Sequence, residues 1–272
     1  MRDGHPGALH GALRNRSRSA IALCYHSIAA PGPPWTSVGP DLFERQLAAL
    51  RRHGYGAARE SSLTQLASGA RPERRLALLT FDDGYVDNHA TAYPLLRAYG
   101  MTATFFLLPP FVDTGAPLIW PEVEDRAATH PEVMRSLTWP QVGEMAEGGC
   151  EFGSHGLTHR AMPELSDEDL HEELWESRRR IKERLGSCET LAYPFGEWSP
   201  RVAAAATAAG YRWAYSLPFG AQHATTPMSI PRVPVDHRDG DRRFAAKLTP
   251  IGRRVLLSPL KGQLRHIKRR PL

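Results

Sequence analysis

The run Leu76-Ala77-Leu78-Leu79-Thr80-Phe81 is followed directly by Asp82-Asp83-Gly84-Tyr85, and this junction is the most informative point of the chain. A short apolar run that stops at an Asp-Asp-Gly turn is typical of a buried strand. Parallel α/β folds keep their ligand sites at the carboxyl ends of such strands. The sequence therefore predicts a functional edge that carries Asp82 and Asp83, although Asp-Gly pairs also form ordinary solvated turns.

Two histidines follow a second segment of the same kind. Cys150-Glu151-Phe152-Gly153 has the composition of another short strand, and Ser154-His155-Gly156-Leu157-Thr158-His159 comes directly after it. Residues four apart share one face of a helical turn, so His155 and His159 are predicted to reach a common ion from such a turn. The alternative for this pair alone is two surface histidines in a polar loop.

The acid pair and the histidine pair together indicate a hydrolase. One carboxylate and two imidazoles form a metal site that keeps positions open for water and substrate. Side chains alternate along a strand, so two neighbouring acids can take different roles, and a dication relieves their mutual repulsion. The second carboxylate is then placed to act as a base toward the attacking water.

These segments resemble the motifs of the polysaccharide deacetylases of the NodB-homology type, carbohydrate esterase family 4. Thr80 to Tyr85 matches the first motif in full, and His155 to His159 matches the second in spacing, with Gly156 where Ser or Thr is usual. Ala192-Tyr193-Pro194-Phe195-Gly196 resembles the third motif. The resemblance extends from about Ile21 to about Val235, which is most of the chain.

The resemblance implies a role for each motif residue. Asp83, His155 and His159 would bind the metal, and Asp82 would be the general base. Zinc is the expected ion for one Asp and two His, with iron, cobalt and nickel as alternatives. The third motif of the family usually carries an Arg that holds the base, and Ala192 occupies that place here.

Two later segments are expected to complete the site. Arg232 lies in Ser229-Ile230-Pro231-Arg232-Val233 and is placed to reach the base from the end of a later strand; the alternative is a surface cation. The tetrahedral oxyanion is expected to rest on the metal and on a backbone N–H near Phe195 or Gly196. Tyr193 is assigned to the same substrate-facing side.

The general acid has two candidates. Ala20-Ile21-Ala22-Leu23-Cys24-Tyr25-His26 is an apolar strand that ends in a histidine, like the other two motifs. It resembles the Tyr-His opening of the poly-N-acetylglucosamine deacetylases, a branch with circularly permuted motif order in which the acid histidine comes first. We therefore expect His26 to be the acid. The alternatives are that His26 only caps a core strand, or that the late His237, in a polar stretch, is the acid.

Strand-like and helix-like segments alternate along most of the chain, which favours parallel βα units. With the family resemblance, the predicted fold class is α/β, a distorted (β/α) barrel of about seven parallel strands. Residues 109–131 break the alternation, because they are rich in Pro, and are predicted to form an irregular insertion that walls the substrate groove. Trp120 of this insertion is either exposed to a sugar ring or simply packed.

The 272 residues suffice for one such barrel. The expected organisation is an N-terminal extension at 1–19, a catalytic domain at 20–238 and a basic C-terminal tail at 239–272. The arginines of the extension precede an apolar run that is too short for a secretory signal, so a cytoplasmic location is predicted. Three scattered cysteines fit buried free thiols in a reducing compartment.

The C-terminal tail carries much of the basic excess of the chain, which is +5 overall. Lys and Arg are interspersed there with apolar residues, so the tail is either a solvated terminus or a peripheral contact with an anionic membrane surface. No nucleic-acid motif accompanies it, and no nucleic-acid partner is expected. No stretch of the sequence is long and apolar enough to span a membrane.

The function that the sequence favours is metal-dependent removal of N-acetyl groups from an N-acetylated amino sugar in a polysaccharide, a lipid-linked sugar or a glycoside. An iron oxygenase with the same three ligands leaves Asp82 beside Asp83 unexplained. A catalytically silent carbohydrate-binding or membrane-associated module of the same fold is the other alternative, which the absence of Arg at Ala192 supports. Retention of both acids, His155 and His159 favours the enzyme.

Overall fold

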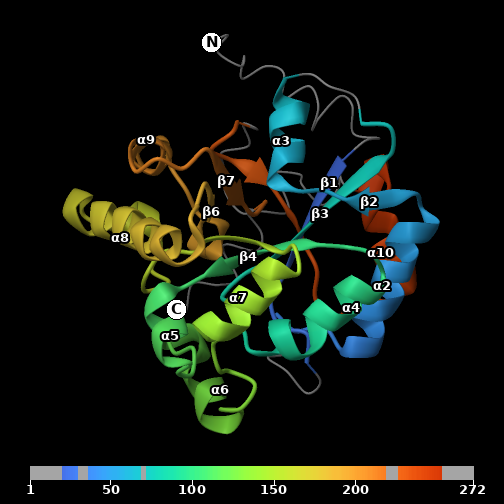
Figure 1. Cartoon of the computed structure of the whole chain (residues 1–272), viewed down its shortest axis with the longest axis horizontal. Helices are drawn as coiled ribbons and strands as arrows, with labels where there is room; N and C mark the ends of the chain where they lie inside the picture. The colour runs from blue at the N-terminus through green and yellow to red at the C-terminus, as the bar shows by residue number, and fades with distance from the viewer. Residues whose placement is uncertain (1–19, 30–35, 69–71, 219–225, 253–272) are drawn as a thin grey trace, which may run out of the picture.

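The computed structural model of the chain describes residues 20–29, 36–68, 72–218 and 226–252. Its central feature is a ring of parallel strands with helices around the outside (Figure 1). Neighbouring strands are bonded in the order β8-β7-β6-β5-β4-β3-β1-β9. The strands of this path are β1 (Ala20–Tyr25), β3 (Arg75–Phe81), β4 (Ala103–Leu107), β5 (Glu151–Ser154), β6 (Thr190–Ala192), β7 (Trp213–Ser216), β8 (Ile230–Pro231) and β9 (Val233–Pro234).

One short segment nearly closes the ring. β8 pairs with β7 and β9 pairs with β1, and only Arg232 separates β8 from β9 along the chain. With this segment counted as one strand, it joins β1, β3, β4, β5, β6 and β7 in a barrel of seven parallel strands, which confirms the predicted fold class. β2 (Tyr55–Ala57) lies off this path and pairs with the start of β3.

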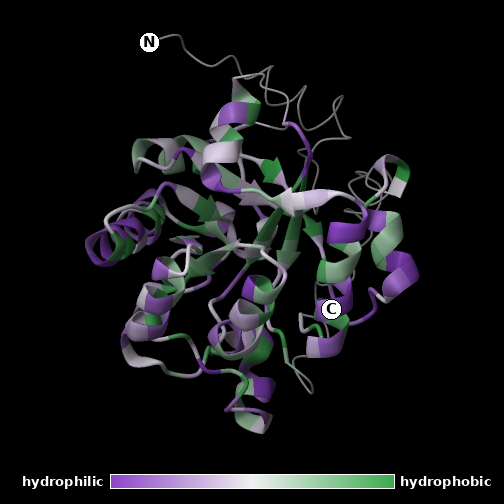
Figure 2. Cartoon of the chain, turned by 45° about the vertical axis from the view of Figure 1, so that its right-hand side comes forward, coloured by the Kyte–Doolittle hydropathy of each residue, from purple (hydrophilic) through white to green (hydrophobic). Residues whose placement is uncertain are grey.

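Helices cover the outer side of the barrel. Figure 2 shows apolar residues concentrated in the central strands and polar residues on the surrounding helices. The α-helices are α2 (Pro40–Arg52), α3 (Glu60–Ala67), α4 (Tyr93–Ala98), α5 (Pro109–Thr114), α6 (Glu124–Thr129), α7 (Trp139–Glu147), α8 (Asp167–Leu185), α9 (Pro200–Ala208) and α10 (Asp241–Lys247). The shorter helical turns are η2 (Asn88–Ala92), η3 (Pro121–Val123), η4 (Met162–Glu164) and η5 (Pro194–Gly196).

Local sequence explains where these helices begin and which face they bury. α2 starts with Pro40 in its first turn, where a missing N–H costs nothing. Phe43 and Leu47, one helical turn apart, are fully buried. α8 follows Ser166, whose Oγ accepts a hydrogen bond from the Asp169 N–H at 3.1 Å and so caps the helix.

The region at 109–131 is more regular than predicted. It contains α5, η3 and α6, and prolines stand in the first turns of α5 and η3. A small separate core holds it in place and consists of Tyr85, Leu108, Leu118, Trp120, Val123, Ala127 and Met134. The prediction of an irregular insertion was wrong because a proline that begins a helix has the same sequence signal as one that breaks it.

The folded body continues past residue 238, where the sequence predicted the start of a tail. α10 packs against α2, with Phe244 fully buried. Asp239 and Lys247 form a buried ion pair, and Lys247 Nζ also donates to the Pro234 carbonyl at 2.6 Å. The tail therefore begins later than residue 239. The expected extension at 1–19 and the remaining tail at 253–272 lie outside the described residues.

Within the described part of the chain, no helix combines the length and the apolar character needed to cross a bilayer. Cys24, Cys150 and Cys188 are free and buried, as the sequence predicts.

Candidate active site

The side chains singled out in the sequence gather at the carboxyl ends of the strands. Asp82 and Asp83 follow β3, and His155 and His159 follow β5. Arg232 lies between β8 and β9. Because parallel strands all end at the same rim of the barrel, residues that are far apart in the sequence meet there.

Asp83, His155 and His159 form a candidate metal centre. Asp83 Oδ1 lies 3.3 Å from Nε2 of His155 and 3.4 Å from Nε2 of His159. One ligand atom of each residue lies within 4.8 Å of the others, and all three side chains are buried. Asp83 Oδ1 has no hydrogen-bond partner. A buried, unpartnered carboxylate oxygen that faces two imidazole nitrogens is a donor set that fits a zinc-like cation.

The ring of His155 is oriented by the backbone of Ala192. Nδ1 of His155 lies 2.7 Å from the Ala192 carbonyl oxygen. A carbonyl oxygen only accepts, so Nδ1 carries the proton, and Nε2 of the neutral ring presents its lone pair toward Asp83. Burial alone lowers the pKa of His155, but the charges of Asp82 and Asp83 outweigh burial and raise this pKa above its ordinary value.

The two histidines do not lie on a helical turn, so this part of the prediction was wrong. Residues 155–161 are non-helical, and φ is +86° at Gly156 and +59° at His159. Positive φ at both positions turns the backbone back on itself and carries His159 toward Asp83. A spacing of four residues fits both a helical turn and this loop, so spacing alone does not distinguish them.

Unusual backbone conformations are concentrated in this site. Among the described residues, the non-glycine positions with positive φ are Asp83 at +72°, His159 at +59° and Phe195 at +58°. Two of them belong to the candidate metal centre, and the Phe195 ring lies 4.6 Å from the His159 ring, centroid to centroid. Such conformations persist where the surrounding structure enforces them, and they cluster at functional sites.

Arg232 holds Asp82 and supplies the cation that Ala192 does not. Nη1 of Arg232 donates to Asp82 Oδ1 at 2.6 Å, and Nη2 donates to Oδ2 at 2.8 Å. Arg232 is 0% exposed, and its Cζ lies 5.5 Å from the Phe106 ring centroid and 5.7 Å from that of Tyr215. Burial raises the pKa of Asp82, but the Arg232 charge lowers it below its ordinary value. Asp82 is thus ionised and fixed in orientation.

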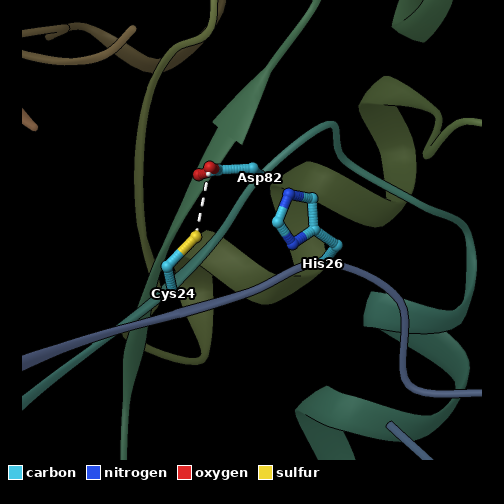
Figure 3. Close-up of side chains that lie close together, drawn as sticks. All are labelled: Cys24, His26 and Asp82. Carbon is cyan, nitrogen blue, oxygen red and sulfur yellow. Dashed lines mark hydrogen bonds between the residues drawn. The ribbon is translucent and has the colours of Figure 1, made fainter. Parts of the chain in front are cut away.

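The sequence interpretation missed a contact made by Cys24. Its Sγ donates to Asp82 Oδ2 at 3.3 Å (Figure 3). Cys24 pairs in register with Thr80 across β1 and β3, and Thr80 Oγ1 accepts from Arg232 at 3.0 Å. Residues paired across parallel strands point to the same side of the sheet, so alignment of the two predicted strands is the signal that could have found Cys24.

His26 also lies beside Asp82 (Figure 3). Its Nδ1 is buried and has no hydrogen-bond partner, and its backbone oxygen accepts from Asn88 Nδ2 at 2.8 Å. Burial lowers the pKa of His26, although the nearby carboxylates act in the opposite direction. The alternative acid, His237, is exposed in the turn between β9 and α10.

The third-motif residues form the end of β6, Tyr193 and the helical turn η5. Tyr193 is fully buried, and its hydroxyl donates to the Met228 carbonyl at 2.9 Å, so its side chain supports the turn instead of facing the substrate as expected. The Gly196 N–H donates to the Tyr193 carbonyl at 2.8 Å and is engaged as well. The backbone N–H of Phe195 is the candidate oxyanion donor that this geometry leaves.

Trp120 packs on His159 instead of facing solvent. Their rings are stacked, with centroids 4.1 Å apart and planes at 26°, and Trp120 is only 8% exposed. Phe195 meets the same imidazole edge-on. Nδ1 of His159 is buried and has no hydrogen-bond partner. Aromatic packing and the backbone of the loop therefore hold this ring, in contrast to His155.

Comparison with known proteins gives the family. The model of the family described as polysaccharide deacetylase matches residues 69–214, more than half of the chain. The Bacillus subtilis (strain 168) protein YxkH, which carries the name of a polysaccharide deacetylase, is 29% identical over 202 residues, 73% of this chain and 64% of that protein. The poly-beta-1,6-N-acetyl-D-glucosamine N-deacetylase of Escherichia coli (strain K12) is 25% identical over 268 residues, 85% of this chain and 38% of that protein. The chain spans less than two thirds of the length of either relative.

Solved structures share the fold. The Streptococcus pyogenes deacetylase PplD, in complex with acetate, has a TM-score of 0.72 at 22% identity and covers 85% of this chain and 98% of its own. IcaB from Ammonifex degensii has a TM-score of 0.67 at 23% identity and covers 85% of this chain and 97% of its own. The family match includes both the acid pair and the histidine pair. The chain belongs to the polysaccharide deacetylase family.

Proposed function

We propose that this chain is a metal-dependent carbohydrate N-deacetylase, a hydrolase that removes N-acetyl groups from an N-acetylated amino sugar. The observation that carries the proposal is the different environment of two adjacent acids. Asp83 Oδ1 faces two imidazole nitrogens at 3.3 and 3.4 Å, whereas both oxygens of Asp82 are bound by Arg232. One acid is thus suited to a metal and the other to proton transfer.

The metal would be held by Asp83, His155 and His159. When bound, it would polarise the acetyl carbonyl and lower the pKa of a water molecule. Zinc is the expected ion for this donor set, and iron, cobalt and nickel are also compatible with it.

Asp82 is the proposed general base. Arg232 keeps the carboxylate ionised and occupies one lone pair on each oxygen. Cys24 occupies a further lone pair on Oδ2, so Oδ1 is the oxygen with more room to accept a proton from the attacking water. The developing oxyanion would be met by the backbone N–H of Phe195.

His26 is the proposed general acid. An amine is a poor leaving group, so the departing nitrogen of the sugar needs a proton as the carbon–nitrogen bond breaks. The buried, unpartnered Nδ1 of His26 belongs to the side chain that lies beside Asp82. A histidine with an open nitrogen next to the base can deliver that proton.

The two competing functions each lose their main argument. A silent module was supported by the missing Arg at Ala192, and Arg232 now provides the cation at Asp82. An iron oxygenase gives no role to a second buried acid held by an arginine.

Names of relatives such as the poly-N-acetylglucosamine deacetylase favour an N-acetylglucosamine polymer as the substrate. A cytoplasmic location and a membrane contact by the tail stay predictions from the sequence.

Acetate release from an N-acetylglucosamine oligomer tests the proposal. The protein is stripped of metal, divided, and assayed with and without one equivalent of zinc, cobalt, nickel or iron. We expect release only in the presence of a metal and loss of release after a chelator is added. If no metal supports release from an oligomer, a lipid-linked sugar or a small glycoside, the silent module of the same fold becomes the better description.

A further inference from the structure

The loop between the two histidines depends on side chains for its hydrogen bonds. Gly156 and Leu157 are buried and non-helical, so their N–H groups need acceptors from elsewhere. The Gly156 N–H donates to Ser154 Oγ at 3.0 Å. The N–H groups of Leu157 and Thr158 both donate to Glu173 Oε2, at 2.6 and 3.2 Å. One carboxylate on α8 therefore binds two consecutive amides between His155 and His159.

Both carboxylate oxygens of Glu173 contact this loop. It is 2% exposed, and its other oxygen, Oε1, accepts a short hydrogen bond from the Thr158 hydroxyl. Arg160, at the end of the same loop, brings Nε to 3.5 Å from Oε1. A buried carboxylate is costly unless hydrogen bonds and charge compensate it, and Leu157, Thr158 and Arg160 supply them here.

The position of Gly156 has no room for a side chain beside the Glu173 carboxylate. A Cβ at this position would lie 2.8 Å from Glu173 Oε2, and φ is +86°. The Ser or Thr that the family motif usually carries at this place would collide with Glu173 and adopt a strained backbone. The departure from the motif at Gly156 and the buried Glu173 are thus two parts of one arrangement.

We propose that Glu173 is a positioning residue for the metal centre, and that it sets metal affinity by fixing the loop that carries His159. The inference rests on the proposed metal site of Asp83, His155 and His159. His159 needs this support because its Nδ1 has no hydrogen-bond partner, whereas His155 is fixed by the Ala192 carbonyl. Groups that orient metal ligands typically change metal affinity by about 10- to 100-fold when removed.

The test compares zinc affinity across variants of the metal-free chain, measured by competition with a chromophoric zinc chelator. Glu173→Ala should weaken zinc binding by about 10- to 100-fold. Glu173→Gln keeps an oxygen for the two amides, and the Thr158 hydroxyl can reverse to accept from the new NH₂ group, so it should retain most of the affinity. Glu176→Ala is the matched control, because Glu176 lies on the same helix but pairs with Arg179 and Arg180.

Circular dichroism identifies variants that fail to fold. If Glu173→Ala is unfolded, Thr158→Val takes its place. It removes the hydroxyl that donates to Glu173 and accepts from Arg160 Nε at 3.1 Å, but it leaves both backbone amides on Glu173 Oε2, so it should weaken zinc binding by a smaller factor. Equal zinc affinity in the wild type, the folded loop variant and Glu176→Ala would overturn the inference and leave the metal site intact. If the wild-type chain itself binds no metal, the proposed function fails, and the inference fails with it.

Discussion

Arg232 and Ala192 show how two residues can divide a task that one motif residue usually performs. Ala192 provides a backbone carbonyl for His155, and Arg232 reaches Asp82 from a segment that closes the barrel. The sequence could predict Arg232 as a candidate, because a strand-end arginine favours a carboxylate. Composition alone gave no sign of the Cys24 contact, since a lone buried cysteine usually only packs. Only alignment of the two predicted strands, which pairs Cys24 with Thr80, would have pointed to it.

The hydrogen bond from Cys24 leads to a prediction about turnover. Cys24→Ala removes a donor to the ionised Asp82, so we expect kcat to fall about tenfold, with KM and zinc content unchanged. Cys24→Ser keeps a donor and should recover most of the activity. Cys188→Ala, which removes another buried thiol, serves as the control. Equal losses in the Ala and Ser variants would mean that Cys24 acts through packing alone.

The role of His26 can be separated from general damage by a change of leaving group. His26→Ala should slow hydrolysis of an N-acetyl sugar far more than that of an activated aryl acetate, because the aryloxide leaves without a proton. Metal content should stay the same. Burial lowers the pKa of His26, so amide hydrolysis by the wild type should decline as pH rises through a pKa that lies below the ordinary value for histidine. The same leaving-group effect in His237→Ala, and not in His26→Ala, would place the acid at His237.

At the scale of elements, the segment after β1 is held in place by hydrogen bonds to the turn after β3. Asp87 accepts from Ser27 Oγ at 2.7 Å and from the Ile28 N–H at 2.8 Å, and Asn88 at the start of η2 binds the His26 backbone. The structure has a π-helical turn, η2, directly before α4. A period of 3.6 residues does not reveal an extra residue in one turn, because tertiary contacts select it.

Asp87 should make stability depend on pH. Burial raises its pKa to about 6, against about 3.9 in an unfolded chain. The folded state therefore holds this proton more tightly, and stability should fall as pH rises from about 4 to about 6. Asp87→Asn removes the ionisation and keeps an acceptor oxygen. The free energy of unfolding, measured with urea, should therefore fall less between these pH values in the variant than in the wild type, by on the order of 1–3 kcal/mol.

The exposed Asp125 of α6 provides the control for this measurement. Asp125→Asn should run parallel to the wild-type curve, because it leaves Asp87 and its hydrogen bonds intact. If the stability difference between Asp87→Asn and the wild type is constant from pH 4 to 7, the carboxyl of Asp87 titrates normally and the buried hydrogen bonds do not require its proton.

At the scale of the whole molecule, alternation of strands and helices predicted parallel βα units, and the family resemblance added the closed barrel. Its closure was not predictable in detail, because β8 and β9 are two short strands that pair with opposite neighbours around one inward arginine. The length of the folded body was also underestimated. Phe244 and Lys247 belong to a basic stretch that has the composition of a tail, and only their packing against the body shows otherwise.

Metal binding should therefore be visible in the stability of the entire barrel. The proposed ligands come from two segments, Asp83 after β3 and the histidines after β5, so a bound ion would cross-link parts of the chain that separate on unfolding. A ligand that binds only the folded state raises the melting temperature with its concentration. We expect zinc to raise the Tm of the metal-free chain and EDTA to reverse the rise.

Two variants separate metal binding from proton transfer at the site. His159→Ala removes one of three ligands, so the zinc-dependent rise in Tm should be largely lost together with stoichiometric zinc. Asp82→Asn leaves the ligands in place, so the rise and the zinc content should persist while acetate release collapses, because the base is gone. Full zinc occupancy in His159→Ala would show that the ligand set is wrong. Loss of zinc in Asp82→Asn equal to that in His159→Ala would make Asp82 a ligand instead of the base, and Arg232 would then have to be understood as the partner of a metal-bound carboxylate.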